Sequence, residues 1–225
     1  MSMSSTDKGL LTPQNCAVVF IDHQTQMLLS LPGQERQALV DNLLILAKAA
    51  RIFRVPVILS LIESKEFAGK LAPQLGAEFP EQVPLKRTSL NAWDDAQFVA
   101  AVRRTGRRNF LLAAMWSEAC LVFPAVQMLE EGYGIYVVKD ASAGTHPAAH
   151  DPALRRIEQA GGVSLTALQV LLEFQRDLAR CDHYEEVIAM VRPCCRTPVE
   201  GAGLATKTGG VPFESGLARG DESHD

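Results

Sequence analysis

The sequence has no apolar run long enough to span a membrane, and its N-terminal stretch, MSMSSTDKGLLTPQN, lacks the apolar core of a signal peptide. It also has no basic patch or stripe, since 22 basic residues stand against 26 acidic ones and the net charge is −4. Proteins that bind nucleic acid usually carry such a patch. We therefore expect a cytoplasmic protein whose partners include neither a membrane nor nucleic acid.

Paired cysteine spacing is missing as well. The chain has five cysteines, an odd number, which disfavours a disulfide framework and indicates free thiols in a reducing compartment. Cys16 begins an apolar run and is interpreted as core packing. Cys181, Cys194 and Cys195 lie near the C-terminus, where His183 alone does not complete a metal site, so no metal is expected there.

The pattern of apolar residues predicts one α/β domain. Hydrophobic residues make up 47% of the chain and charged residues 21%, as in an ordinary globular protein. Short apolar runs typical of buried parallel strands alternate with amphipathic helical patterns. The predicted strands are 16–21, 57–62, 110–115, 135–140 and 163–167, and the predicted helices are 35–53, 94–106, 117–131, 151–160 and 168–180. This order is typical of a three-layer αβα fold with a central, mostly parallel, doubly wound sheet.

The remaining segments are predicted to be less regular. The stretch 63–87 contains several Gly and Pro residues and is interpreted as a long excursion rather than a packed element. A last helix is expected over 183–191. We divide the chain into a flexible N-terminal arm, 1–14, a central α/β domain, 15–180, and a C-terminal part, 181–225, made of that helix and a mobile or oligomerisation tail.

Cys120 is the strongest candidate for a reactive side chain. Ser117 suits a helix N-cap, which places Cys120 near the third position of the first turn. There the helix dipole and free backbone N–H groups lower a thiol pKa and can hold an oxyanion. Considered alone, Cys120 is better explained as a packing residue, because cysteine is often buried. The nucleophile hypothesis therefore depends on its partners.

Two charged residues are expected beside Cys120. Asp22 follows the first strand, and residues that follow different parallel strands converge at one edge of a doubly wound sheet. The excursion before Lys86 is long enough to bring its side chain to the same edge. In this arrangement Cys120 attacks a carbonyl carbon, Asp22 accepts and returns the proton, and Lys86 stabilises both negative charges.

These residues lie in segments that resemble a known family. The segments are VVFIDHQ around Asp22, LKRTSLNAWDD around Lys86 and AAMWSEACLVFPAVQMLEEGYGIYVVKDASAG around Cys120. The chain, from about residue 14 to 180, resembles the YcaC-like branch of the isochorismatase-like cysteine hydrolases. The resemblance implies an Asp22, Lys86, Cys120 triad that hydrolyses a small amide, ureido or related acyl compound through a thioester, without a cofactor. It also implies a homo-oligomer, with an octamer among the options. Arg87 adjoins Lys86, and which of the two cations points inward is left open, although the family spacing favours Lys86.

The resemblance further implies a cis peptide between Met115 and Trp116. That bond is expected to direct the N–H groups of Trp116 and Cys120 at an oxyanion. The sequence departs from the family at Trp116, where a small or β-branched residue is usual, so the substrates of the family need not transfer. Gln24, Asn91 and Trp93 are further candidates for substrate contacts.

Several alternatives remain open for these residues. Asn91 can equally be a helix N-cap and Trp93 a packed aromatic residue. His23 is interpreted as structural, and the loop residues His146 and His150 are expected to be exposed to solvent.

Other functions are set against this hypothesis. Nicotinamidases of the same superfamily hold a metal through histidines after the second strand, whereas the corresponding segment here, LIESKEFAG, contains none, so a metal-dependent nicotinamidase is disfavoured. Members that cleave isochorismate lack a cysteine at the nucleophile position, so Cys120 favours attack on an acyl carbon. The rivals are a redox-responsive protein in which Cys120 is a reactive thiol that oxidises, and a structural assembly protein in which it is inert.

Overall fold

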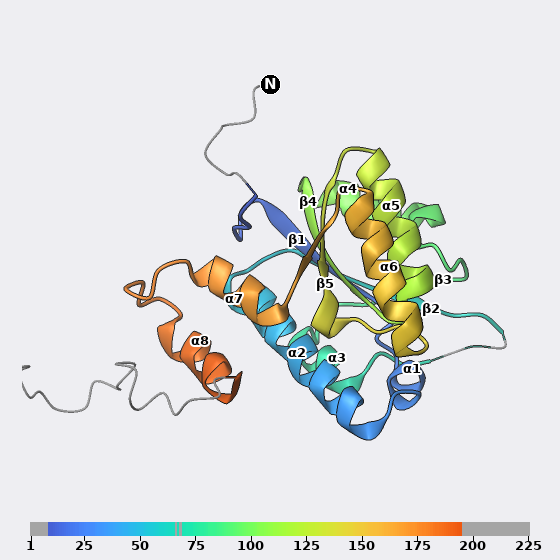
Figure 1. The fold of residues 1–225 in the computed structure, drawn as a ribbon. Coiled ribbons are helices and arrows are strands. Elements are labelled where there is room, and N and C mark those ends of the chain that lie inside the picture. Colours follow the sequence, from blue (N-terminus) through green and yellow to red (C-terminus); the bar gives the residue numbers. More distant parts are fainter. Residues whose placement is uncertain (1–8, 66, 68, 195–225) are drawn as a thin grey trace, which may run out of the picture.

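The computed structural model describes residues 9–65, 67 and 69–194. A six-stranded parallel sheet forms its centre, with the strand order β3-β2-β1-β4-β5-β6 (Figure 1). The strands are β1 Cys16–Ile21, β2 Val57–Ile62, β3 Leu85–Arg87, β4 Asn109–Ala114, β5 Gly134–Val138 and β6 Val163–Leu165. The order reverses between β1 and β4, which confirms the doubly wound α/β prediction. No helix among the described residues is long and apolar enough to cross a membrane.

Helices cover both faces of the sheet, as the three-layer prediction requires (Figure 1). Alternate residues of the buried central strands supply the two cores: in β1, for example, Val18 and Phe20 pack on one side and Val19 and Ile21 on the other. One face packs against α1 Thr25–Leu29, α2 Gly33–Ile52, α3 Pro73–Glu78, α7 Ala167–Gln175 and α8 Tyr184–Val191, and the other against α4 Ala96–Arg104, α5 Val122–Glu130 and α6 Pro147–Gln159.

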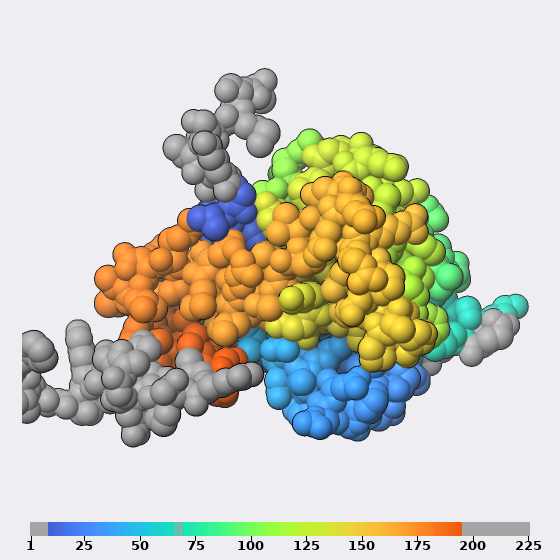
Figure 2. All heavy atoms as spheres, viewed as in Figure 1, coloured from blue at the N-terminus to red at the C-terminus, as the bar shows by residue number. Residues whose placement is uncertain are grey.

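The segment before β1 is held against the end of α7. Leu11 donates its N–H to the Glu173 carboxylate at 2.8 Å, and Arg176 donates to the Leu11 carbonyl at 3.2 Å. The space-filling view shows the blue N-terminal segment lying against the orange C-terminal helices (Figure 2). Part of the predicted arm is therefore packed, whereas residues 1–8, Cys195 and the tail from 195 onwards lie outside the described residues.

The structure corrects three predictions of local structure. The excursion 63–87 contains two packed elements, α3 and the edge strand β3, that were not predicted. Helix α6 begins at Pro147 rather than Asp151. Helix α7 ends at Gln175 rather than Arg180, because Arg176 has a positive φ of 60°, with which an α-helix cannot continue.

Candidate active site

Asp22 and the turn that carries Cys120 lie side by side because β1 and β4 are neighbours in register. Ile21 pairs with Ala114, and the next residue, Met115, donates its N–H to the Ile21 carbonyl at 3.1 Å. Asp22 leaves β1 with φ 62°, and Trp116 leaves the end of β4 with φ 56°. Residues other than glycine rarely adopt this conformation, and when they do they often lie at functional sites. The two bends place the chemistry at the point where the strand order reverses.

Asp22 forms a buried ion pair with Arg87. The Arg87 guanidinium donates through Nη1 to Asp22 Oδ1 at 2.7 Å and through Nη2 to Oδ2 at 2.6 Å. Only 1% of the Arg87 side chain and none of the Asp22 side chain is exposed. Burial opposes the charged form of Arg87, but the hydrogen bonds and charge of Asp22 outweigh it and raise the pKa of Arg87. Arg87 therefore stays charged, and its two hydrogen bonds fix the Asp22 carboxylate in one orientation.

Lys86 does not occupy the predicted position. Its Nζ pairs with the Glu63 carboxylate at 3.0 Å, and 60% of its side chain is exposed. Lys86 and Arg87 are consecutive residues of β3, and consecutive side chains of a strand point to opposite faces. The register that pairs Ile62 with Arg87 directs the arginine inward. The expectation that Lys86 neutralises Asp22 is thus wrong, and Arg87, the alternative left open by the sequence, does so.

Cys120 lies in a π-helical turn, Ser117–Leu121, that leads into α5. The thiol is fully buried, and burial, followed by the charge of Asp22 and a hydrogen bond to it, raises the pKa of Cys120 well above its ordinary value, although Arg87 acts in the opposite direction. The expectation of a lowered pKa is wrong, because burial and the neighbouring Asp22 carboxylate favour the neutral thiol. Ser117 is also not the N-cap: Trp116 occupies that position without a side-chain cap. In this conformation Cys120 is a neutral thiol beside a charged carboxylate.

Comparisons with known proteins show which family the chain belongs to. The family model described as "Isochorismatase domain" matches residues 16–169, which contain Asp22, Arg87 and Cys120. The chain belongs to the isochorismatase family. An Escherichia coli protein named "Probable hydrolase YcaC" is 34% identical over 168 residues, which is 74% of this chain and 81% of that protein. At the level of general enzyme class, the chain is therefore a hydrolase of the isochorismatase family.

Two solved YcaC structures also resemble this chain. YcaC from Pseudomonas aeruginosa, solved with hexane-2,5-diol and covalent acrylamide, has a TM-score of 0.75 at 31% identity and covers 86% of this chain and 95% of its own. YcaC from E. coli, described as an octameric hydrolase of unknown specificity, has a TM-score of 0.72 at 32% identity and covers 82% and 88%.

The peptide geometry implied by the family resemblance differs from that of this chain. No peptide bond among the described residues is cis, so the bond between Met115 and Trp116 is trans and the expectation of a cis bond is wrong. The N–H of Cys120 donates to the Trp116 carbonyl at 2.9 Å. It is therefore engaged within the turn in this conformation, and its contact with an oxyanion stays a prediction. The Trp116 side chain is half-buried, and the centroid of its ring lies 6.2 Å from the centroid of the Phe67 ring.

Gln24 has a structural role. Its amide nitrogen donates to the carbonyls of Ile62 and Gly69 at 3.1 and 2.9 Å, and its oxygen accepts from the Ile62 N–H at 3.2 Å. The side chain is fully buried. These bonds tie the end of β1 to the segment after β2, and a substrate contact through Gln24 stays a prediction.

Asn91 and Trp93 match the structural alternatives. Asn91 Oδ1 accepts from the Trp93 N–H at 3.1 Å, as an N-cap does, and its amide nitrogen donates to Gln127 at 2.6 Å. The Trp93 ring packs edge-on against Tyr133, and its indole N–H donates to Glu131 at 2.7 Å. Gln127, Glu131 and Tyr133 lie in or next to α5. A contact of Asn91 or Trp93 with a substrate stays a prediction.

The histidines that flank the site differ in their surroundings. His23 is fully buried and bonds through Nε2 to the Ala141 carbonyl at 2.9 Å, in line with its interpretation as structural. His146 is exposed, as predicted. His150 is half-buried instead of exposed, and its Nδ1 lies 2.7 Å from the Ser117 hydroxyl oxygen. Among the described residues, no cluster of three or more His, Cys, Asp or Glu side chains is arranged to hold a metal ion.

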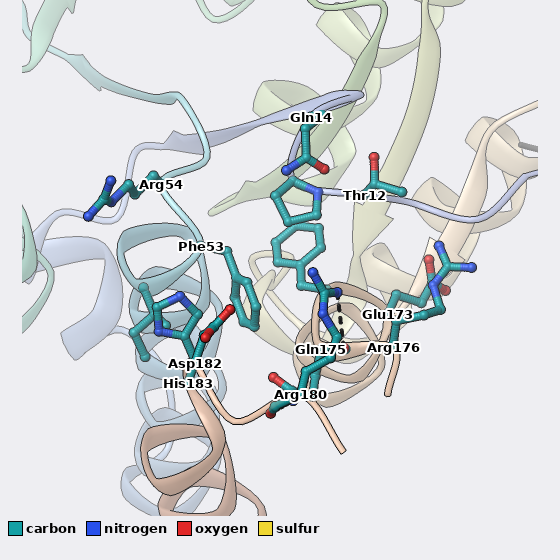
Figure 3. A pocket seen from close by; sticks show the side chains of 13 residues that line it. Thr12, Gln14, Phe53, Arg54, Glu173, Gln175, Arg176, Arg180, Asp182 and His183 are labelled. Carbon is teal, nitrogen blue, oxygen red and sulfur yellow. Dashed lines mark hydrogen bonds between the residues drawn. The ribbon is translucent and has the colours of Figure 1, made fainter. Parts of the chain in front are cut away.

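A surface cavity of about 630 Å³ lies at the opposite end of the sheet, between the start of β1, the end of α2 and the end of α7 (Figure 3). Its arginines do not converge: Arg54 extends away from the centre, Arg176 lies on the far side, and Arg180 donates to the Gln175 carbonyl at 3.5 Å. This cavity is not lined by Asp22, Arg87 or Cys120.

Proposed function

We propose that this chain is a cysteine hydrolase that cleaves the acyl C–N bond of a small amide, ureido or related compound through a thioester on Cys120. The observation that carries the proposal is a buried thiol beside a carboxylate that an arginine holds in a fixed orientation. A carboxylate in contact with a thiol can act as its base at the moment of attack, so no resting thiolate is needed.

The proposed reaction has two halves. The Cys120 sulfur attacks the acyl carbon while its proton passes to the Asp22 carboxylate. The C–N bond then breaks, the nitrogen takes the proton from Asp22, and a thioester remains. Water attacks the thioester, Asp22 accepts a proton from that water, and the sulfur leaves and is reprotonated to the thiol as the acid is released. Arg87 stays paired with both Asp22 oxygens throughout and fixes the orientation of the carboxylate beside the thiol.

The chemistry of a relative supports the nucleophile. The P. aeruginosa YcaC structure carries covalent acrylamide. Acrylamide is an electrophile, and a thiol is the most nucleophilic side chain near neutral pH. The raised pKa and burial of Cys120 also disfavour a redox sensor, because sensor cysteines are exposed and have a lowered pKa.

Labelling with acrylamide tests the proposal. We expect Cys120 to be modified in the native protein, with the exposed Cys181 as an internal reference in the same sample. Asp22→Asn should shift the pH midpoint of Cys120 labelling downward, because Asp22 raises that pKa and Arg87 lowers it. The same variant should reduce hydrolysis of an amide library by about 10²-fold or more, since the base is lost. Peptide mapping by mass spectrometry gives the labelling rates. Modification of Cys120 only after unfolding would refute the nucleophile.

We also propose that the chain forms an octamer, as the E. coli YcaC structure does. Each chain has a mass of 24.5 kDa, so light scattering during gel filtration should give a mass of about 200 kDa. A mass of one chain at micromolar concentration would contradict this prediction. Acrylamide labelling of the separated species then shows whether the reactivity of Cys120 depends on assembly.

A further inference from the structure

The π-helical turn that carries Cys120 is attached to the segment 143–150 by contacts from its first two residues. Ser117 donates its N–H to the Ala143 carbonyl at 3.0 Å, and its hydroxyl shares a hydrogen bond with His150 Nδ1 at 2.7 Å. Ser117 is fully buried and His150 is half-buried. We call the contacts of Ser117 and Glu118 with residues 143–150 the turn clamp.

The state of the His150 ring fits this bond. Burial lowers the pKa of His150 and outweighs the opposite effects of Asp151, Glu118 and a hydrogen bond to the Lys139 backbone. The ring is therefore neutral near pH 7, with one nitrogen that donates to the Lys139 carbonyl and the other, Nδ1, free to accept the Ser117 hydroxyl proton. The imidazole thus connects α6 and the end of β5 to the turn.

Glu118 forms the second half of the clamp. Its carboxylate accepts from the Thr145 hydroxyl at 2.6 Å and from the Thr145 N–H at 3.1 Å. Burial opposes the charged form, but these bonds outweigh it and lower the pKa of Glu118. Gly144 permits the close approach, since a Cβ there would meet the backbone nitrogen of His150 at 2.8 Å and Glu118 Oε2 at 3.0 Å.

The turn needs such support because its backbone is unusual. A π-helical turn is rare outside functional sites, and both Ala119 and Cys120 donate their N–H groups to the single carbonyl of Trp116 at 2.9 Å. Trp116 itself is held at a positive φ, which persists only where the surroundings enforce it. A relaxed α-helical turn would rotate the residues after Ser117 and move the thiol.

We propose that Ser117 and His150 are positioning residues that hold the Cys120 thiol against Asp22. The inference rests on the proposed function, in which Cys120 is the nucleophile. Neither residue reaches the substrate in this scheme: His150 orients Ser117, Ser117 fixes the turn, and the turn presents the thiol to the carboxylate.

Two measurements on the full chain test the clamp. The variants are His150→Ala, His150→Asn, which keeps a hydrogen-bonding atom at the position of Nδ1, and His146→Ala as a matched control at an exposed histidine next to the same helix. Hydrogen exchange measures the protection of amides 117–121. Acrylamide labelling measures the pH at which the labelling rate of Cys120 is half-maximal, with Cys181 as the reference. This midpoint is measured in the wild type and in each variant, with and without Asp22→Asn.

We expect His150→Ala to reduce the protection of the turn about tenfold and to move the Cys120 midpoint toward the ordinary thiol value near 8.5, because the thiol leaves Asp22. The midpoint shift caused by Asp22→Asn should shrink to less than half in this background. His150→Asn should restore both values, and His146→Ala should change neither.

The possible outcomes separate the inference from the proposed function. Unchanged protection in His150→Ala overturns the clamp. Reduced protection with an unchanged midpoint and an unchanged effect of Asp22→Asn shows a purely structural contact and overturns the positioning role. If native wild-type Cys120 does not label while His150→Ala still loses protection, the proposed function fails and the positioning role falls with it, although the clamp itself stands.

Discussion

Replacing Arg87 with methionine is expected to lower the free energy of unfolding by about 3–5 kcal/mol, because it leaves the Asp22 carboxylate buried without its partner. Replacing the adjacent Lys86 with methionine is expected to change it by less than about 1 kcal/mol, since an exposed ion pair contributes little. Urea unfolding of both variants gives the comparison. A larger effect at Lys86 than at Arg87 would contradict the assignment of the buried cation.

Two further variants separate charge from geometry at this pair. Arg87→Lys keeps the charge but not the planar fork that donates to both Asp22 oxygens, so we expect only partial recovery of stability. The double variant Asp22→Asn with Arg87→Met removes both charges and should be more stable than Arg87→Met alone. Equal stabilities of the double and single variants would show that the buried carboxylate is not the source of the loss.

The stability of the protein is also expected to fall in mild acid because of His23. Burial lowers the pKa of His23 from 6.5 to about 4, against the smaller effects of the Ala141 hydrogen bond and Asp22. Between these values the unfolded chain binds a proton that the folded chain does not. The free energy of unfolding should therefore decrease as the pH falls from about 6.5 to about 4, by about 3 kcal/mol in total.

The variant His23→Gln isolates this contribution. A glutamine amide nitrogen can take the place of Nε2 as the donor to Ala141, but the side chain does not titrate. Urea unfolding at pH 7 and pH 4.5 should show a smaller acid loss in the variant than in the wild type. Equal losses would mean that other groups control the acid sensitivity.

The sequence revealed the parts of the site that follow long apolar runs. Asp22 and Cys120 were located because β1 and β4 are continuous buried strands and parallel strands end at one edge. Strand β3 has only three residues, too few for a recognisable pattern. Without that strand and its register, nothing in the sequence decides whether Lys86 or Arg87 faces inward.

The sequence contains a signal for the starts of two helices that our prediction does not include. Both α3 and α6 have proline in the first turn, at Pro73 and Pro147, where its missing N–H has no cost. Pro73 lies in the stretch that we predict to be a long excursion, and Pro147 lies in a stretch that we predict to be a loop. Since α6 begins earlier than predicted, His150 belongs to a helix and reaches Ser117.

The state of the thiol could not be predicted from the sequence. A helix N-terminus lowers a thiol pKa, whereas burial and a neighbouring carboxylate raise it. Only the first effect is visible in the order of residues. The depth of Cys120 and its distance from Asp22 are tertiary properties, and they decide the outcome here.

The residues with positive φ that follow β1 and β4 place backbone strain in the candidate active site and so lower the stability of the fold. Asp22 and Trp116 hold a backbone conformation that glycine adopts without strain. Relief of this strain by glycine would raise the free energy of unfolding by about 1 kcal/mol at each position. At Asp22 this gain is outweighed, because the change also leaves the buried Arg87 without its partner. A search for more heat-resistant variants that ignored activity would therefore tend to change Trp116, whose carbonyl accepts from the Cys120 N–H. Directed evolution of this hydrolase should screen turnover and thermal tolerance together.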